Sequence, residues 1–161
     1  MVVVLMGVSG SGKTTIGQRL ARDLGWPFCE GDAFHPPDNV EKMRRGLALT
    51  DADRDPWLAA LRELIADHLR DGRSAIVACS ALKQVYRDRL RVDMDRVRFV
   101  YLKGDYALLR QRLEARQSHF AKANLLASQF EALEEPQDAL TVEVGEEPEA
   151  VAGLIRRALG L

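Results

Sequence analysis

The sequence predicts a doubly wound α/β domain with a parallel sheet, and three observations lead to this fold class. Short apolar runs of strand length occur without polar alternation, as expected for strands that are covered on both faces. Longer amphipathic stretches of helical length alternate with these runs. The 161 residues, 47% of them hydrophobic, suffice for one domain and are too few for two. Alternation of this kind builds a sheet from right-handed βαβ units.

Three of the apolar runs are rich in β-branched residues and are the strong strand candidates: Val2–Met6, Ser74–Cys79 and Arg98–Leu102. Two weaker candidates are Phe28–Glu30 and Leu140–Val144. Ligands bind at the carboxyl ends of the strands in sheets of this type. The segments that follow the strands are therefore the ones in which a functional site is expected.

Six amphipathic stretches are predicted to be helices: Thr14–Leu24, Pro56–Leu69, Lys83–Arg91, Asp105–Arg116, Asn124–Leu133 and Pro148–Leu159. Pro56 and Pro148 suit the first turn of a helix, because an N–H group is not needed there. Gly25 and Gly72 suit helix C-termini. The predicted domain covers residues 1–161.

Charge and cysteine content exclude several classes of partner. The net charge of −1 provides no broad positive field for a nucleic acid backbone. Cys29 and Cys79 lack metal-ligand spacing and are expected to be buried free thiols, which favours a reducing compartment. The apolar run Val2–Met6 is too short for a signal peptide or a membrane span. We therefore expect a cytoplasmic protein with no nucleic acid and no membrane partner.

Residues Gly7–Thr14 match the Walker A pattern GxxxxGK[ST] in full, between an apolar strand and an amphipathic helix. Glycines let successive backbone N–H groups converge on phosphates, and the positive end of the following helix adds to that field. Lys13 is expected to reach the β- and γ-phosphates of ATP, and Thr14 to ligate Mg²⁺. The predicted phosphate-binding residues of this loop are Gly7, Ser9, Gly10, Ser11, Gly12, Lys13, Thr14 and Thr15.

The remaining sequence narrows the class of P-loop protein. It contains no Asn-Lys-x-Asp motif that would read guanine, and it is too short for a motor or transport ATPase. The strand that ends at Cys79 carries no Walker B acid, so a further magnesium ligand must come from elsewhere, with Asp32 acting through water as the candidate. This layout indicates a kinase that acts on a small metabolite.

Polar groups for an acceptor follow the second and third strands. Asp32 is the best-placed carboxylate to orient and deprotonate an attacking hydroxyl. Arg54, and after the third strand Lys83 and Arg87, are cations that can hold an anionic acceptor.

With these residues in place, the sequence closely resembles the gluconate kinase (gluconokinase) family. The matching segments run in the family's order from residue 7 to about residue 136. Their ordered set is highly specific, although only the phosphate loop is decisive alone. They are Gly7–Thr14, Gly31-Asp32, His35-Pro36, Asn39, Lys42-Met43, Gly46, Asp51, Asp53-Arg54, Pro56-Trp57-Leu58, Cys79-Ser80-Ala81-Leu82-Lys83, Tyr86-Arg87-Asp88, Arg112, Arg116, His119-Phe120, Leu126, Ser128-Gln129-Phe130 and Leu133-Glu134.

The resemblance implies ATP-dependent phosphorylation of D-gluconate at its terminal hydroxyl, giving 6-phosphogluconate and ADP. It implies the P-loop NTPase fold of the nucleoside-monophosphate-kinase and shikimate-kinase type, with a five-stranded parallel sheet, helices on both faces and a mobile lid near residues 116–130. Gluconate is the implied partner, with ATP and Mg²⁺ as cofactors. A homodimer is compatible with the resemblance, because relatives are often homodimers.

The resemblance also assigns roles by position. The implied catalytic residues are Lys13, Asp32 and Arg116. Arg112 and Arg116, four residues apart on one helix face, resemble lid cations that close on the phosphates. His119 is either a substrate contact or a residue that packs the hinge of the lid. The implied substrate-binding residues are Asp32, His35, Arg54, Lys83, Arg87 and His119.

Two other functions compete with this one. A shikimate kinase shares the size, the fold and an anionic polyol acceptor, but the His35-Pro36 turn and the Ser128-Gln129-Phe130 segment argue against it. A non-catalytic ATP-binding module would keep Gly7–Thr14 but need not keep acceptor-side groups such as Asp32. For the adenine base, Val144–Glu147 is a candidate by position only.

Overall fold

The computed structural model describes residues 1–115 and 120–161 and contains a five-stranded sheet in the order β2-β3-β1-β4-β5. All four strand pairings are parallel, so the predicted sheet is confirmed. Every strand candidate from the sequence forms a strand. They are β1 (Val2–Met6), β2 (Phe28–Glu30), β3 (Ala75–Ala78), β4 (Val97–Lys103) and β5 (Leu140–Glu143).

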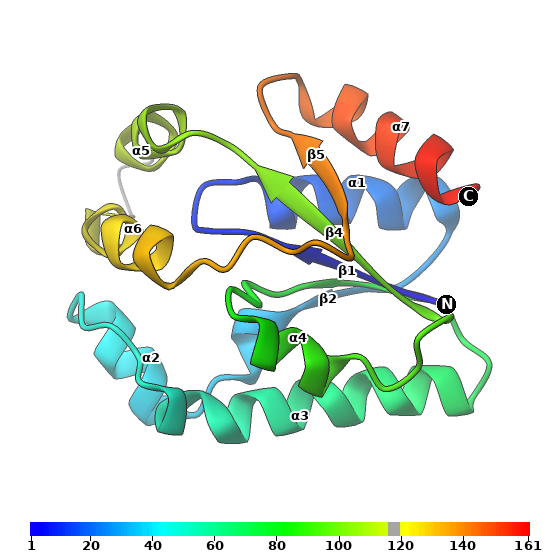
Figure 1. The fold of residues 1–161 in the computed structure, drawn as a ribbon, viewed down its shortest axis with the longest axis horizontal. Helices are drawn as coiled ribbons and strands as arrows, with labels where there is room; N and C mark the ends of the chain where they lie inside the picture. The colour runs from blue at the N-terminus through cyan, green and yellow to red at the C-terminus, as the bar shows by residue number, and fades with distance from the viewer. Residues whose placement is uncertain (116–119) are drawn as a thin grey trace.

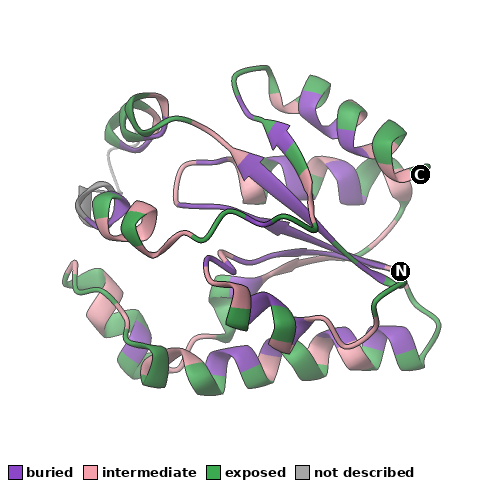
Figure 2. Ribbon diagram, viewed as in Figure 1, coloured by how far each residue is buried: buried purple, intermediate pink, exposed green. Residues whose placement is uncertain are grey.

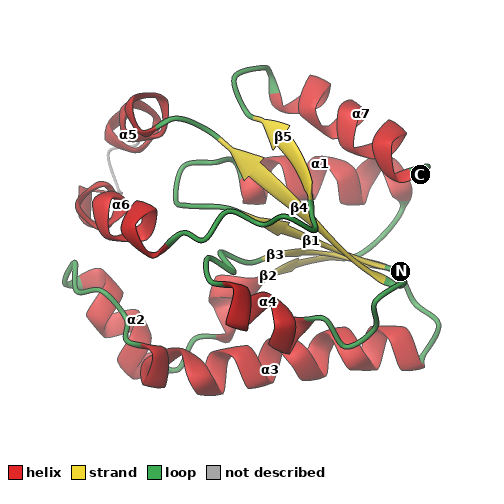
Figure 3. Cartoon of the chain, in the orientation of Figure 1, coloured by secondary structure: helices red, strands yellow, loops and turns green. Residues whose placement is uncertain are grey.

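Helices cover both faces of this sheet, as Figure 1 shows. Helices α1 and α7 lie on one face and α3 and α4 on the other, while α5 and α6 lie beyond the carboxyl ends of the strands (Figures 1 and 3). The helices are α1 (Lys13–Leu24), α2 (Pro37–Arg44), α3 (Asp51–Arg70), α4 (Gln84–Leu90), α5 (Tyr106–Ala115), α6 (Phe120–Ala132) and α7 (Pro148–Leu159), and a 3₁₀ turn spans Gly31–Phe34.

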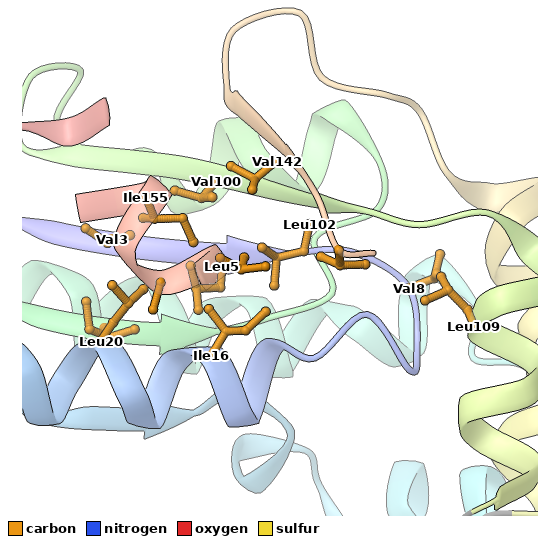
Figure 4. Close-up of a cluster of buried hydrophobic side chains, with 14 of the residues drawn as sticks. Val3, Leu5, Val8, Ile16, Leu20, Val100, Leu102, Leu109, Val142 and Ile155 are labelled. Atoms are coloured by element: carbon orange, nitrogen blue, oxygen red, sulfur yellow. The ribbon is translucent and has the colours of Figure 1, made fainter. Parts of the chain in front are cut away.

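The apolar core is divided by the sheet into two clusters, because successive side chains of a strand point to opposite faces. On one face, Val3 and Leu5 of β1 pack with Leu20 of α1 and Ile155 of α7 (Figure 4). On the other face, Val4 packs in a second cluster that also contains residues of α3 and α4. Figure 2 shows that the central strands β1 and β3 are buried throughout, while the helices are exposed on their outer sides.

The topology places a crevice at the carboxyl ends of β1 and β3. These strands are neighbours, yet the helix that follows β1 packs on one face of the sheet and the helix that follows β3 packs on the other. Such a switch point opens a crevice in which ligands bind. The N–H of Gly7 donates to the Ser80 carbonyl at 3.2 Å and the N–H of Cys79 to the Leu5 carbonyl at 3.0 Å, which joins the two loops at this point.

The helix predicted at Pro56–Leu69 corresponds to α3, and its predicted start at Pro56 is wrong. The helix begins at Asp51, because Thr50 and Asp53 form a capping box: the Asp53 N–H donates to the Thr50 hydroxyl at 3.1 Å, and the Thr50 N–H donates to the Asp53 carboxylate at 2.9 Å. Pro56 therefore lies inside the helix, past its first turn.

Helix α2 was not predicted. It is short and polar, and Asn39 is its one buried residue, so it has no apolar stripe that a sequence pattern could show. In the described ranges no helix is both long and apolar enough to cross a membrane.

The capping box generates a prediction for stability. Thr50→Ala removes the hydroxyl that accepts from Asp53, so we expect the free energy of unfolding to fall by about 0.5–2 kcal/mol. Urea titration followed by circular dichroism measures the change. Glu63→Ala, on the exposed side of the same helix, is the control and should change stability by less than about 0.5 kcal/mol. Equal stability of Thr50→Ala and the wild type would show that the cap contributes nothing.

Candidate active site

Two cavities lie against the phosphate loop. The first has a volume of about 690 Å³ and is walled by the loop, α2, α3, α6 and the segment after β3. The second, of about 420 Å³, lies between the loop, α5 and the segment after β5. Predicted site residues in the first cavity are Ser9, Lys13, Asp32, His35, Arg54 and Lys83. Those in the second are Gly10, Gly12, Thr15 and Arg112.

The phosphate loop has the conformation that anion binding needs. Gly12, with φ of 90°, is the left-handed N-cap of α1, a conformation that favours glycine. The Lys13 ammonium folds back over the loop and donates to the carbonyls of Gly7 at 2.9 Å and Val8 at 3.0 Å. The positive end of α1 and the Lys13 ammonium therefore both contribute positive charge at the phosphate loop.

Thr14 lies beside a carboxylate that the sequence analysis overlooked. Its hydroxyl donates to Glu30 at 2.6 Å, and Glu30 is the last residue of β2. Among the described residues no cluster of three or more His, Cys, Asp or Glu could hold a metal ion by itself. Mg²⁺ is usually held by one or two protein oxygens together with phosphates and waters. The oxygen donors of Thr14 and Glu30 fit that requirement.

Asp32 is placed by the glycine that precedes it. A Cβ on Gly31 would lie 2.2 Å from the Ala78 carbonyl oxygen, so only glycine permits this approach of the chain to the end of β3. The Gly31 carbonyl in turn accepts from the buried indole Nε1 of Trp57 at 2.8 Å. Trp57 therefore anchors the turn that carries Asp32, whereas Arg54 is held by other groups.

Cys79 lies close enough to three charged site residues for their charges to affect the pKa of its thiol. Burial raises the pKa of its thiol to about 12, and the charges of Asp32, Lys13 and Glu30 act on it more weakly. Cys79 is thus an inert, buried thiol, as predicted. Because Asp32 and Lys13 both act on it, the acceptor-side carboxylate and the phosphate-loop lysine lie near the same point. Cys29 is only half-buried, contrary to expectation.

His35 is held in one orientation by two neighbours. Its ring stacks on Trp57 with ring centroids 4.3 Å apart. The Asn39 amide nitrogen donates to the Asp53 carbonyl at 2.7 Å and lies 3.3 Å from His35 Nδ1. Because an amide nitrogen only donates, Nδ1 accepts, and the proton of the neutral ring is on Nε2.

The electrostatic surroundings of His35 favour its neutral form. Burial lowers the pKa of the ring, the Asp32 carboxylate raises it, and the nearby Arg54 lowers it further. Burial has the largest effect, so His35 offers a neutral N–H donor at the cavity.

The two acceptor-side cations are tied into one network. Lys83 pairs with the Asp51 carboxylate at 2.9 Å, and the Tyr86 hydroxyl donates to the same carboxylate. Arg54 donates to the Leu49 carbonyl and approaches the Tyr86 hydroxyl at 3.5 Å. The hydrogen bond from Tyr86, followed by that from Lys83, lowers the pKa of Asp51. The network fixes both cations on one wall of the first cavity.

The structure does not bring Arg87, a predicted gluconate ligand, to this cavity. Its side chain is 1% exposed and donates to the carbonyls of Ala81 and Leu82, each at 3.0 Å. Ala81 has a φ of 42°, which an L-residue rarely adopts. Arg87 therefore braces a strained turn between Ser80 and Lys83, because its guanidinium satisfies the turn's buried carbonyls.

Arg112 lies in the second cavity and donates to the Val144 carbonyl at 2.6 Å. This hydrogen bond holds the segment after β5, the positional candidate for the base, beside the phosphate loop. Arg116 and His119 lie outside the described residues, as does the start of the predicted lid at residues 116–119.

Gln129, on α6, is a second residue that the site prediction missed. Its side-chain oxygen accepts from the Ser9 N–H at 2.6 Å, and its amide nitrogen donates to the Ser9 hydroxyl at 3.0 Å. The Ser128-Gln129-Phe130 segment stood out in the sequence only through the family resemblance. Glu30 had a clearer signal, because it directly precedes Gly31-Asp32 at the carboxyl end of a predicted strand.

Comparison with known proteins identifies close relatives of this chain. A protein-family model described as an AAA domain matches residues 2–139. The chain is 50% identical to a gluconokinase of Gluconobacter oxydans over 136 residues, which is 84% of this chain and 76% of the relative. It is 44% identical to the thermoresistant gluconokinase of Escherichia coli, over 93% of this chain and 88% of that one.

Solved structures give the same grouping. A gluconokinase from Sinorhizobium meliloti is similar with a TM-score of 0.84 and 43% identity, over 99% of this chain and 94% of that one. A shikimate kinase from Bacteroides thetaiotaomicron, at 19% identity and a TM-score of 0.74 over 100% of this chain and 99% of that one, shares the fold alone. The predicted fold class is therefore confirmed.

The environment of His35 generates a prediction for pH. We expect the pKa of His35 to lie below its ordinary value of 6.5, and Asp32→Asn to lower it further, because the Asp32 charge raises it. The folded state disfavours the charged ring, so the unfolded chain binds the imidazole proton at a higher pH than the folded chain does. The contribution of His35 to the free energy of unfolding is therefore lost as the pH falls from 6.5 toward the lower pKa of the folded state. An NMR titration of the imidazole protons measures the pKa. Asp38→Asn, which removes an exposed carboxylate from α2, should leave it unchanged.

Proposed function

Because this chain belongs to the gluconokinase family, we propose that it transfers the γ-phosphate of ATP to the terminal hydroxyl of D-gluconate. The products are 6-phospho-D-gluconate and ADP. The enzyme is a P-loop phosphotransferase with an alcohol group as acceptor.

One observation carries the proposal: Lys13, of the phosphate loop, and Asp32, of the turn after β2, line a single cavity. Phosphoryl transfer needs positioning and charge stabilisation more than covalent chemistry from the protein. A carboxylate that meets the attacking hydroxyl beside a lysine that meets the transferring phosphate satisfies both needs. A non-catalytic ATP-binding module has no use for this pairing.

On the acceptor side, we assign the gluconate carboxylate to the wall formed by Arg54 and Lys83. Cationic donors hold carboxylates through charge-assisted hydrogen bonds. His35 donates its Nε2–H to a hydroxyl of the sugar acid, while Asp32 accepts the proton of the attacking terminal hydroxyl and so raises its nucleophilicity.

On the nucleotide side, we assign the base to the second cavity, between Arg112 and the segment that begins at Val144. The backbone N–H groups of the loop and the Lys13 ammonium hold the phosphates and stabilise the charge that spreads over them during transfer. Arg116 closes on the same phosphates in this proposal.

Thr14 is the residue that we assign to Mg²⁺, with Glu30 orienting the Thr14 hydroxyl through their 2.6 Å hydrogen bond. When bound, the ion neutralises phosphate charge and orients the β- and γ-phosphates. Asp32, acting through water, was the sequence-based candidate for a further magnesium ligand. We add Glu30 as a second candidate.

Four further expectations accompany the proposal. Arg87 supports the acceptor site through the Ala81 turn and does not bind substrate itself. His119 is a substrate contact from the lid. The protein is cytoplasmic and forms a homodimer, which size-exclusion chromatography with light scattering would detect.

The acceptor is tested by an ADP-release assay across a panel of sugar acids. We expect turnover with D-gluconate, weaker or no turnover with aldonates of other hydroxyl configuration, and none with shikimate. Turnover with shikimate alone would assign the chain to the competing kinase class. ATP binding without turnover on any acceptor would favour the non-catalytic module.

The role of Asp32 is tested by Asp32→Asn, which keeps the shape of the side chain and removes the base. We expect kcat with gluconate to fall by about 10²–10⁴-fold, the usual contribution of general base catalysis, while ATP affinity stays unchanged. Steady-state kinetics and calorimetric ATP titration give the two quantities. Asp38→Asn is the matched control and should retain full activity; unchanged turnover in Asp32→Asn would remove Asp32 from the mechanism.

A further inference from the structure

Gln129 is the point at which helix α6 touches the phosphate loop. The two partners are 120 residues apart in sequence, and both atoms of the Gln129 amide are engaged: one with the Ser9 backbone at 2.6 Å, the other with the Ser9 hydroxyl at 3.0 Å. The proposed mechanism gives Gln129 no role. A two-point contact of this kind orders both segments and requires an explanation.

The backbone N–H that Gln129 occupies is one that a phosphate would need. In a Walker A loop, successive N–H groups point toward the bound phosphates. Ser9 lines the first cavity, together with Asp32, whereas Gly10 and Gly12 line the second. Ser9 therefore lies on the acceptor side, where the terminal phosphate of ATP must meet the hydroxyl. In the proposed function the Ser9 N–H binds a phosphate oxygen, so the Gln129 amide oxygen, 2.6 Å from the nitrogen, occupies the same donor.

We propose that Gln129 is an internal competitor of the γ-phosphate, a latch that holds α6 on the phosphate loop and is released when ATP binds. This inference rests on the nucleotide half of the proposed function. The terminal phosphate replaces a neutral amide with an anionic oxygen, which makes the stronger hydrogen bond. ATP therefore displaces the latch, and its apparent affinity is reduced by the free energy of the contact that is lost.

The rest of α6 shows what the release would change. Just beyond its C-terminal end, Glu134 is tied to the segment after β3: its N–H donates to the Leu82 carbonyl at 2.9 Å, and its carboxylate accepts from the Gln84 N–H at 2.6 Å. Leu125 and Ala132 of the same helix line the acceptor cavity. With Gln129 released and Glu134 retained, α6 pivots about its C-terminal end. ATP binding thereby reshapes the cavity that receives gluconate.

The variant Gln129→Met tests the latch, because it keeps the length and most of the volume of the side chain but removes the amide. The probes are ADP and the ATP analogue with an imido bridge between the β- and γ-phosphates, each with Mg²⁺ and without gluconate, titrated by calorimetry. We expect Gln129→Met to bind the analogue about two- to tenfold more tightly than the wild type, the equivalent of one or two neutral hydrogen bonds. Binding of ADP, which has no γ-phosphate, should be unchanged.

Two further variants complete the experiment. Gln129→Asn keeps an amide but is one methylene shorter, so it should give the same gain, and it replaces Gln129→Met if that variant does not fold. Ala127→Met adds the same methionine to an exposed position of α6 and should bind both nucleotides as the wild type does.

Equal or weaker binding of the analogue by both Gln129 variants would overturn the inference, as would an equal gain for ADP. If the wild type binds neither nucleotide, the proposed function fails as well. Wild-type binding without a gain in the variants is the failure of the inference alone, so the two failures are distinguishable.

Discussion

Strand β1 pairs with β3 in parallel, from Val2 opposite Ala75 to Leu5 opposite Ala78, and the two strands send their following helices to opposite faces of the sheet. The phosphate loop and the Ser80–Lys83 turn are therefore forced to emerge side by side, joined by the hydrogen bond between Gly7 and Ser80. In the proposed mechanism, the phosphate donor and the anionic acceptor meet where these two loops meet. The remaining site residues are arranged around this junction.

The third participant in the junction is Gly31, which lies against the end of β3 so closely that no side chain fits between them. This contact turns the chain directly after Glu30 and delivers Asp32 toward Lys13. Trp57 fixes the turn from the α3 side, by a hydrogen bond to the Gly31 carbonyl and by stacking on His35. One buried indole thus orients both the acidic and the imidazole side of the acceptor cavity.

Sequence analysis located what is encoded locally. The five strands are visible in the sequence as apolar runs, and the Walker A loop has a fixed spacing, so both were predicted correctly. Helix α2 was missed because it buries only Asn39, and the start of α3 was misplaced because a proline was given more weight than the Thr50–Asp53 capping box.

Roles that depend on distant contacts were beyond the reach of a sequence pattern. Arg87 and Lys83 both follow the turn after β3. The Arg87 guanidinium is buried against backbone carbonyls, whereas Lys83 lines the cavity. Gln129 carries no charge and lies 120 residues from Ser9, so nothing in its neighbourhood in the sequence connects it with phosphate. Only the packing of α6 against the loop reveals the contact.

Three of the groups that would bind anions already have a partner within the protein. The Lys13 ammonium donates to two loop carbonyls, Lys83 pairs with Asp51, and the Ser9 N–H donates to Gln129. A cation or N–H that lost water without gaining a partner would destabilise the fold, since an unsatisfied polar group in a cavity wall is costly. Internal partners keep these groups oriented without that cost, and the neutral carbonyl and amide partners of Lys13 and Ser9 are weaker acceptors than a phosphate oxygen in the same position. Selectivity then follows, because a ligand must supply anionic oxygens at several of these points together before it replaces the contacts that the protein makes with itself.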